Sequence, residues 1–305
     1  MLPNPIFTFA LGENVSISVH MYGVMIAVGI LATFIVLYTY GKSIGLKTSF
    51  IDFIYYNAIA AIAIGFVSAA AFQGLYNFIE DPSRGFSMNG GITFIGGLIG
   101  GAGVFLLVYL LFRRKLDGRL YDMLSLAPCC ILIAHAFGRV GCFFAGCCYG
   151  RATESFLGVK FPELASKVHP TMLYEAAFLF VLFAVCSYLL LKKSFKHNMS
   201  LYLLSYGVFR FLIEFLRDDH RGKLLGFITP SQFWAVIMVA LGVGVFFIVR
   251  RIGKNEEFKV EITEESEQEV TDEQQKVYPS YTSLIKWTKS SVFLTKLLSC
   301  VMVST

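Results

Sequence analysis

Two pairs of ionisable residues lie four positions apart inside strongly apolar stretches of this sequence. Arg210 and Glu214 fall within SYGVFRFLIEFLR, and His135 and Arg139 fall within LIAHAFGRVGCFF. Residues four apart share one face of a helix and can contact each other, and Arg217 follows Glu214 about one turn later. A planar guanidinium donates two hydrogen bonds at once to a phosphate or a carboxylate. The Arg210–Glu214 pair therefore predicts either an ion pair that locks two helices or a site for an anion.

Three further polar residues border apolar stretches. His169 begins HPTMLYEA, where Pro170 suits the first turn of a helix, and Glu175 follows within the first turns. Tyr22 stands near the start of the first apolar stretch, where it is either an interfacial tyrosine or a site residue. His169 is the first candidate for a base. His135 is the second, although a histidine that only packs the helix explains it equally well.

Seven cysteines occur, and three of them form the pattern C-x4-C-C at Cys142, Cys147 and Cys148. Adjacent cysteines rarely pair with each other, so a bridge would join Cys142 to one of the other two. Free thiols are the alternative. A zinc site usually shows C-x2-C twice, and that spacing is absent. We therefore expect a cluster of three cysteines that are either free thiols or include one disulfide, with no metal and no other cofactor.

The elements that position these residues are apolar helices. The chain has 305 residues, of which 56% are hydrophobic and only 15% charged. A helix needs about 20 apolar residues to cross a bilayer. Seven stretches qualify, which predicts an all-α membrane protein of about seven transmembrane helices: 19–40, 52–73, 94–112, 120–138, 170–191, 199–216 and 228–249.

Basic residues follow every odd-numbered stretch, as at Lys42, Arg113, Lys192 and Arg250. The positive-inside rule then puts the N-terminus outside and the C-terminus in the cytoplasm. The net charge of +5 lies mostly in these loops and needs no nucleic acid as a partner. Under this topology the arginines and carboxylates described above share the outward half of the bilayer. The natural anionic ligand at that depth is a phospholipid.

Two domains are expected, a seven-span catalytic domain at 1–253 and a cytoplasmic tail at 254–305. Residues 255–275 are acidic and polar, which is typical of a disordered segment or a solvated helix. Residues 281–303 mix large apolar side chains with lysines and predict an interfacial amphipathic helix rather than an eighth span. The glycines in GGITFIGGLIGGAG predict close helix packing, with a groove for an acyl chain as the alternative.

Taken in order, these motifs resemble the prolipoprotein diacylglyceryl transferase family of the bacterial inner membrane. The resemblance runs from about residue 4 to residue 250 and includes PNPIFTF, VHMYGVM, GGITFIGGLIGG, GRVGCFFAGCCYG, HPTMLYEA, YGVFRFLIEFLR and TPSQ. It implies a seven-span enzyme that moves diacylglyceryl from phosphatidylglycerol to the lipobox cysteine of an exported prolipoprotein. A phospholipid-binding or thiol-redox protein of the same fold, without transfer activity, is the alternative.

The resemblance also implies roles for individual residues. Catalysis would involve Arg139, Arg210, His169 and Tyr22, and substrate binding would involve Arg139, Arg210, Glu214, Gly138, Gly150 and Glu175. The sequence departs from the family pattern at five positions. Cys142, Ala145 and Cys147 stand where the family has Asn, Asn and Glu, and Met172 stands where Gln is usual. Ile95 occupies the position of a histidine implicated in catalysis, so the thiol proton needs another acceptor, or else nearby arginines must favour the thiolate.

Overall fold

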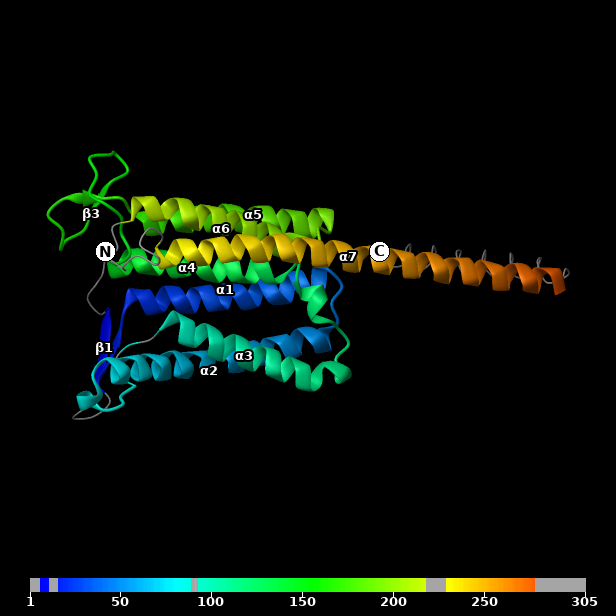
Figure 1. Cartoon of the computed structure of the whole chain (residues 1–305), viewed down its shortest axis with the longest axis horizontal. Coiled ribbons are helices and arrows are strands. Elements are labelled where there is room, and N and C mark those ends of the chain that lie inside the picture. Colours follow the sequence, from blue (N-terminus) through cyan, green and yellow to red (C-terminus); the bar gives the residue numbers. More distant parts are fainter. Residues whose placement is uncertain (1–5, 11–15, 89–90, 92, 218–228, 278–305) are drawn as a thin grey trace, which may run out of the picture. The chain divides into compact units, whose positions relative to one another are not determined.

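The computed structural model describes residues 6–10, 16–88, 91, 93–217 and 229–277. Seven helices within this part are long and apolar enough to cross a membrane, which confirms the predicted number of spans. They are α1 (Met21–Ser43), α2 (Thr48–Glu80), α3 (Phe94–Phe112), α4 (Ala127–Ala145), α5 (Thr171–Lys193), α6 (Asn198–Ile213) and α7 (Pro230–Val277). The chain is thus a multi-pass helical membrane protein (Figure 1).

Short elements connect these helices. An antiparallel hairpin of β1 (Phe7–Ala10) and β2 (Ser16–Val19) precedes α1, and β3 (Val159–Lys160) pairs with β4 (Lys167–Val168) before α5. Four turns of 3-10 helix are η1 (Pro82–Arg84), η2 (Arg113–Lys115), η3 (Leu120–Met123) and η4 (Glu214–Leu216).

The fourth span does not lie where hydropathy predicted it. The expected range was 120–138, whereas α4 runs from Ala127 to Ala145. Residues 120–123 form η3 instead, and Pro128 sits in the first turn of α4. The helix ends at Gly146, whose φ of 69° is left-handed. Arg139 and Cys142 therefore lie inside the helix, whereas the expected range ended before both of them.

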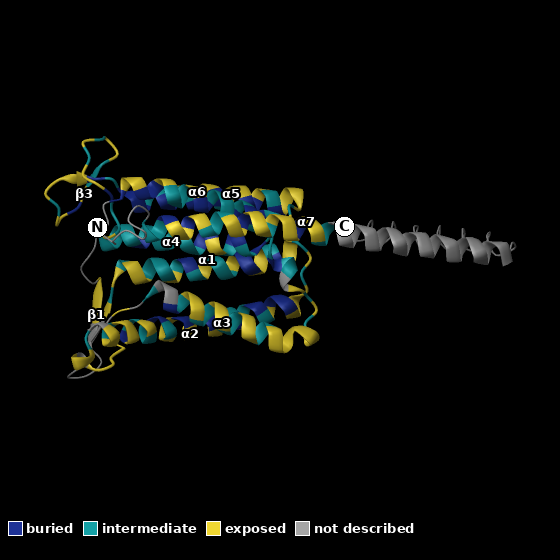
Figure 2. Cartoon of the chain, viewed as in Figure 1, coloured by how far each residue is buried: buried dark blue, intermediate teal, exposed yellow. Residues whose placement is uncertain are grey.

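Two units make up the chain, Met1–Phe246 and Phe247–Thr305. In the first, α2 packs along α3, α1 along α4, and α4 along α5. Leu126, Leu132 and Leu179 are completely buried in the core between these helices. Many residues on the helices are exposed (Figure 2). They include numerous large apolar side chains, as expected for surfaces that face lipid.

The glycine run packs α3 against α2, as the small-residue spacing predicted. A Cβ on Gly97 would lie 3.4 Å from the Cβ of Ala69, and one on Gly101 would lie 3.1 Å from the carbonyl oxygen of Ala61. The hydroxyl of Ser68 also donates to the carbonyl of Gly96, at 2.8 Å. These contacts favour helix packing over an acyl groove on this face.

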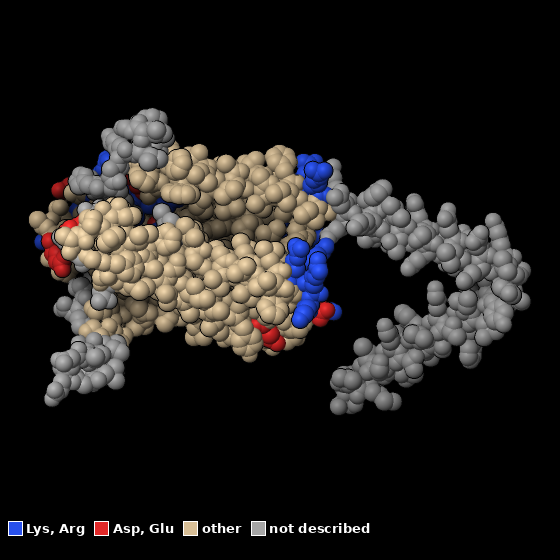
Figure 3. Space-filling model, turned by 60° about the horizontal axis from the view of Figure 1, so that its bottom comes forward, with Lys and Arg blue, Asp and Glu red and all other residues tan. Residues whose placement is uncertain are grey.

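Basic side chains gather at one end of the bundle (Figure 3), where Lys42, Arg113, Arg114, Lys192 and Lys193 occupy the last turns of helices or the turn that follows. This arrangement supports the predicted orientation, which remains a prediction. The acidic stretch after residue 254 continues α7 as a helix as far as Val277. The predicted interfacial helix at 281–303 lies outside the described residues.

Candidate functional site: two buried carboxylates that hold arginines

Glu175 is the centre of a buried polar cluster between α4, α5 and α6. Its side chain is completely buried, and its Oε1 lies 3.0 Å from Nε of Arg139 and 3.6 Å from Nε2 of His135. The hydroxyl of Tyr206 donates to the same oxygen at 2.6 Å. A buried charge needs a partner and hydrogen bonds, and Arg139 and Tyr206 supply them. Glu175 therefore fixes the position of Arg139.

His135 completes this cluster. Nε of Arg139 donates to Nε2 of His135 at 3.3 Å, and the imidazole packs edge-on against Tyr206 with the ring centroids 5.1 Å apart. An imidazole nitrogen that accepts a hydrogen bond carries no proton, so this contact requires the neutral tautomer with the proton on Nδ1. The contacts of Arg139 with Glu175 and His135 both use Nε, and neither occupies its terminal Nη groups.

Glu214 is the centre of a second cluster. Its Oε2 lies 3.2 Å from Nη2 of Arg210 and 3.9 Å from Nε of Arg217, which confirms the pairing predicted from the four-residue spacing. Its Oε1 accepts a hydrogen bond from the hydroxyl of Thr229 at 3.0 Å. Arg210 also donates to the hydroxyl of Ser231 at 2.9 Å. The carboxylate thus holds two guanidinium groups at the end of α6.

The start of α7 is built to reach this second cluster. In Thr229-Pro230-Ser231-Gln232 the backbone N–H of Thr229 donates to Oε1 of Gln232, and the N–H of Gln232 donates to Oγ1 of Thr229. This reciprocal arrangement is a capping box, and proline follows the cap at the first helical position. The same motif that starts the helix thus places two hydroxyls on Glu214 and Arg210.

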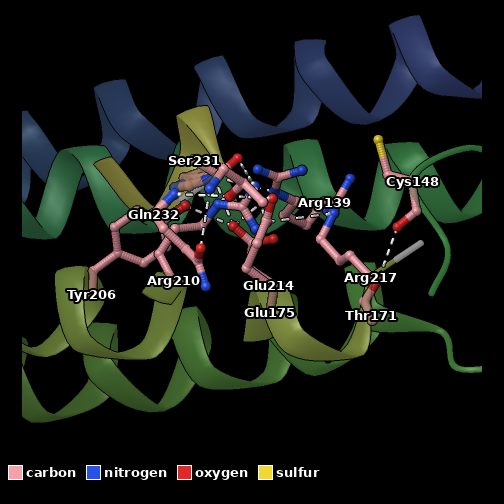
Figure 4. A network of polar contacts seen from close by, with 12 residues as sticks. Arg139, Cys148, Thr171, Glu175, Tyr206, Arg210, Glu214, Arg217, Ser231 and Gln232 are labelled. Carbon is pink, nitrogen blue, oxygen red and sulfur yellow. Dashed lines mark hydrogen bonds and ion pairs between the residues drawn. The ribbon is translucent and has the colours of Figure 1, made fainter. Parts of the chain in front are cut away.

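The two clusters converge between α4, α5, α6 and the start of α7 (Figure 4). The two clusters together contain three guanidinium groups and two carboxylates, so they carry one net positive charge when His135 is neutral. Nη1 of Arg210 is buried and has no hydrogen-bond partner among the described residues. A buried donor without a partner costs about 1–3 kcal/mol, so this group is suited to an anionic ligand.

Gly150 joins the loop after α4 to the end of α6. Its N–H donates to the carbonyl of His169 at 2.8 Å, it pairs with Arg217 in an antiparallel bridge, and the N–H of Arg151 donates to the carbonyl of Leu216. A Cβ at Gly150 would collide with the Leu216 carbonyl and the Thr171 side chain. The contacts of Gly150 are therefore with the protein backbone, and they set the position of Arg217.

His169 lies just before α5 but outside both clusters. Within the described residues its ring contacts Tyr174, with 3.3 Å between Nδ1 and the tyrosine hydroxyl. The structure thus brings His135, the second candidate base, into the polar network. His169, the first candidate, stays outside this network. Sequence spacing could not separate the two, because the contact of His135 with Glu175 joins different helices.

Tyr22 and Gly138 flank the network on its α1 side. Tyr22 is in the first turn of α1, 40% exposed, and a Cβ on Gly141 would lie 3.1 Å from its ring. It is also near enough to Arg139 and the cysteines of the C-x4-C-C pattern to interact with them electrostatically. Gly138 precedes Arg139, and among the described residues no atom beyond its chain neighbours and its own helix backbone lies within 4 Å of the place where its Cβ would be. Both residues border open space beside Arg139.

The three cysteines of the C-x4-C-C pattern meet at the end of α4. Cys142, Cys147 and Cys148 are free thiols, and their sulfur atoms lie within 4.8 Å of one another. Hydrogen bonds from Cys142 and Cys147 lower the pKa of Cys148, and the nearby Arg217 guanidinium acts in the same direction. Hydrogen bonding to the other two thiols raises the pKa of Cys147. We name this group the thiol cluster.

Sequence reasoning missed several members of the network. Tyr206, Ser231 and Gln232 were not singled out as site residues, although TPSQ has the spacing of a capping box. Tyr206 lies four positions before Arg210, so the two residues share one face of the helix. This spacing could have identified Tyr206 as a site residue. The ion pair between Arg139 and Glu175 was not predicted either, because it joins α4 to α5.

Comparisons with known proteins agree with this architecture. Residues 9–248 match the family model described as prolipoprotein diacylglyceryl transferase. A phosphatidylglycerol–prolipoprotein diacylglyceryl transferase of Clostridium tetani is 35% identical over 247 residues, which cover 78% of this chain and 96% of the relative. Proteins with corresponding names are 29% identical in Clostridium perfringens, over 81% of this chain and 97% of the relative, and 31% identical in Teredinibacter turnerae, over 79% and 86%. The chain therefore belongs to the prolipoprotein diacylglyceryl transferase family.

Proposed function

We propose that this protein transfers a diacylglyceryl group from phosphatidylglycerol to the lipobox cysteine of an exported prolipoprotein. The observation that carries the proposal is the convergence of Arg139 and Arg210, each held by its own buried carboxylate. Relatives that align over most of this chain are named for this reaction. Membership of their family makes the chain a transferase.

The reaction exchanges two bonds. The acceptor thiol loses its proton, and its sulfur forms a thioether bond to the glyceryl carbon that carries the phosphate. The bond from this carbon to the phosphate oxygen breaks, and glycerol phosphate leaves. Negative charge grows on the departing phosphate, so guanidinium groups that are already in position lower the barrier. Each charge-assisted hydrogen bond contributes about 1.5–3 kcal/mol.

In this proposal Arg139 and Arg210 bind the phosphate directly. Arg139 offers the Nη groups that its contacts with Glu175 and His135 leave unused, and Arg210 offers its buried Nη1. Glu175 and Glu214 are positioning residues because both are buried and act through the arginines. We assign Gly138 and Tyr22 to the border of the lipid site, where Gly138 leaves room beside Arg139.

The thiol proton needs a route that does not pass through Ile95. An aliphatic side chain carries no titratable group, and Ile95 stands where the family resemblance implies a histidine. His135 is the better supported candidate because it belongs to the network of Arg139 and Glu175, whereas the ring of His169 contacts Tyr174. To act as a base, His135 would use Nε2 after giving up its hydrogen bond from Arg139. The guanidinium groups would add to either route by favouring the thiolate.

We place the protein in the bacterial inner membrane, with the site in the outward half and the basic end of the bundle in the cytoplasm. The distribution of basic residues supports this orientation (Figure 3). A reporter fused after Lys196 should be active only in its cytoplasmic form, and a reporter inserted within 150–168 only in its exported form. The reverse pattern would contradict the proposed orientation.

The proposed activity is tested with the purified full-length protein, phosphatidylglycerol vesicles and a lipobox peptide. We expect the peptide to gain the mass of one diacylglycerol unit as a thioether, together with release of glycerol phosphate. A peptide whose cysteine is replaced by serine is the matched control and should stay unmodified. If phosphatidylglycerol binds but no product forms at any pH, the protein is a phospholipid-binding member of the family rather than an enzyme.

A further inference from the structure

The thiol cluster brings three metal-binding atoms together in a small space. The sulfur atoms of Cys142, Cys147 and Cys148 lie within 4.8 Å of one another. Cys142 belongs to the last turn of α4, and the other two follow its left-handed end at Gly146. Cys147 is exposed, whereas Cys142 and Cys148 are partly buried. The cluster is therefore open to solvent on one side.

A strained backbone helps to hold the cluster. Cys148 has φ of 64°, in the left-handed region that residues with a Cβ rarely adopt. Two hydrogen bonds support this conformation: the N–H of Cys147 donates to the carbonyl of Cys142, and the hydroxyl of Thr171 donates to the carbonyl of Cys148 at 2.8 Å. Strain of this kind gathers at functional sites, where the surroundings enforce it.

We propose that the thiol cluster is a binding site for one thiophilic divalent cation, with Zn²⁺ as the natural candidate. Zinc holds thiolate sulfur at about 2.3 Å in a tetrahedral arrangement, which places the sulfurs about 3.8 Å apart. The observed separations need only small side-chain adjustments to reach this geometry. Hard cations such as Mg²⁺ prefer oxygen ligands and do not suit three thiols. Water would take the fourth position on the exposed side.

The charge of the surroundings favours a divalent ion. A complex of Zn²⁺ with three thiolates carries one net negative charge. The guanidinium of Arg217 lies near Cys148 and would balance this charge. Nε of Arg217 also lies 3.9 Å from Oε2 of Glu214, so the cation site borders the arginine clusters. A disulfide would use only two of the three sulfurs, whereas a metal ion accounts for the closeness of all three.

The experiment titrates Co²⁺, a spectroscopic substitute for Zn²⁺, into the reduced, purified full-length protein. We expect a thiolate-to-cobalt charge-transfer absorption that saturates at one equivalent and disappears when Zn²⁺ displaces the cobalt. Cys142→Ser and Cys147→Ser should each lose this absorption. Cys130→Ser is the matched control because Cys130 is in the same helix but outside the cluster, and it should keep the absorption. This readout does not depend on transferase activity.

Size-exclusion chromatography of each variant separates loss of a ligand from loss of the fold. Cys147 is exposed, so its serine variant tests the proposal even if Cys142→Ser aggregates. The proposal is overturned if the reduced wild-type protein shows no absorption, or if folded cluster variants keep it. It is also overturned if alkylation mapping finds Cys142 bridged to Cys147 or Cys148 and the reduced protein takes up no Co²⁺.

Discussion

Replacing Glu175 by glutamine removes one buried charge and almost no volume. The amide oxygen can still accept from Tyr206, but Arg139 loses the carboxylate that lies 3.0 Å from its Nε. Removing one partner of a buried ion pair costs about 3–5 kcal/mol. We therefore expect Glu175→Gln to lower the free energy of unfolding by an amount in this range.

The same substitution should slow the transfer reaction. An arginine without its carboxylate no longer holds its Nη groups toward the phosphate, and each charge-assisted contact contributes about 1.5–3 kcal/mol. Since about 1.4 kcal/mol corresponds to a tenfold change in rate, kcat/KM should fall roughly ten- to hundredfold. Tyr206→Phe removes only a hydroxyl donor from Glu175, keeps the ion pair, and should have a smaller effect on the rate.

Both effects can be measured on the same preparations. Thermal unfolding in detergent reports stability, and mass spectrometry of a lipobox peptide incubated with phosphatidylglycerol reports the rate. Glu163→Gln changes an exposed carboxylate in the loop before α5 and is the control for a simple change in net charge. A Glu175→Gln protein with the wild-type rate and the wild-type unfolding temperature would show that Glu175 does not hold Arg139 in a functional position.

Three further predictions follow from the contacts in Figure 4 and around the two histidines. Arg139→Lys and Arg210→Lys should each lose at least about tenfold in rate despite keeping the charge, because an ammonium cannot form the two-pronged contact of a guanidinium; a wild-type rate in either variant would leave only a structural ion pair. His135→Gln should lower the rate more than His169→Gln, whereas a rate that is lost only in His169→Gln would identify His169 as the base. Thr229→Val should lower the free energy of unfolding by about 0.5–2 kcal/mol, because it removes a helix cap and a donor to Glu214; an unchanged unfolding temperature would contradict the capping role.

The sequence predicted those features that depend on spacing within one helix. Hydropathy predicted seven spans, and the four-residue spacing predicted the Arg210–Glu214 pair. It did not predict the contact of Arg139 with Glu175, because the register of α4 against α5 depends on side-chain packing between helices. The three cysteines show the same limit, since their spacing did not reveal that the left-handed residues Gly146 and Cys148 bring three sulfur atoms together.

The error in the fourth span has a local cause. Apolar residues such as Met123, Leu124 and Leu126 precede the true helix, so a hydropathy window alone does not fix where it begins. Pro128 in the first turn and Gly146 just after the last turn mark the observed boundaries, in agreement with the preference for proline at helix starts and glycine after helix ends. With these two markers, Arg139 would have been placed inside the helix from the sequence.

The contribution of α7 to Glu214 and Arg210 has a consequence for how the protein is made. A membrane protein is synthesised from its N-terminus, so the first six helices leave the ribosome before Thr229 and Ser231 do. Until the last helix inserts, Oε1 of Glu214 lacks its Thr229 donor and Nη2 of Arg210 lacks its Ser231 acceptor. The order of synthesis therefore delays completion of the arginine site until the whole helical bundle has been assembled in the membrane.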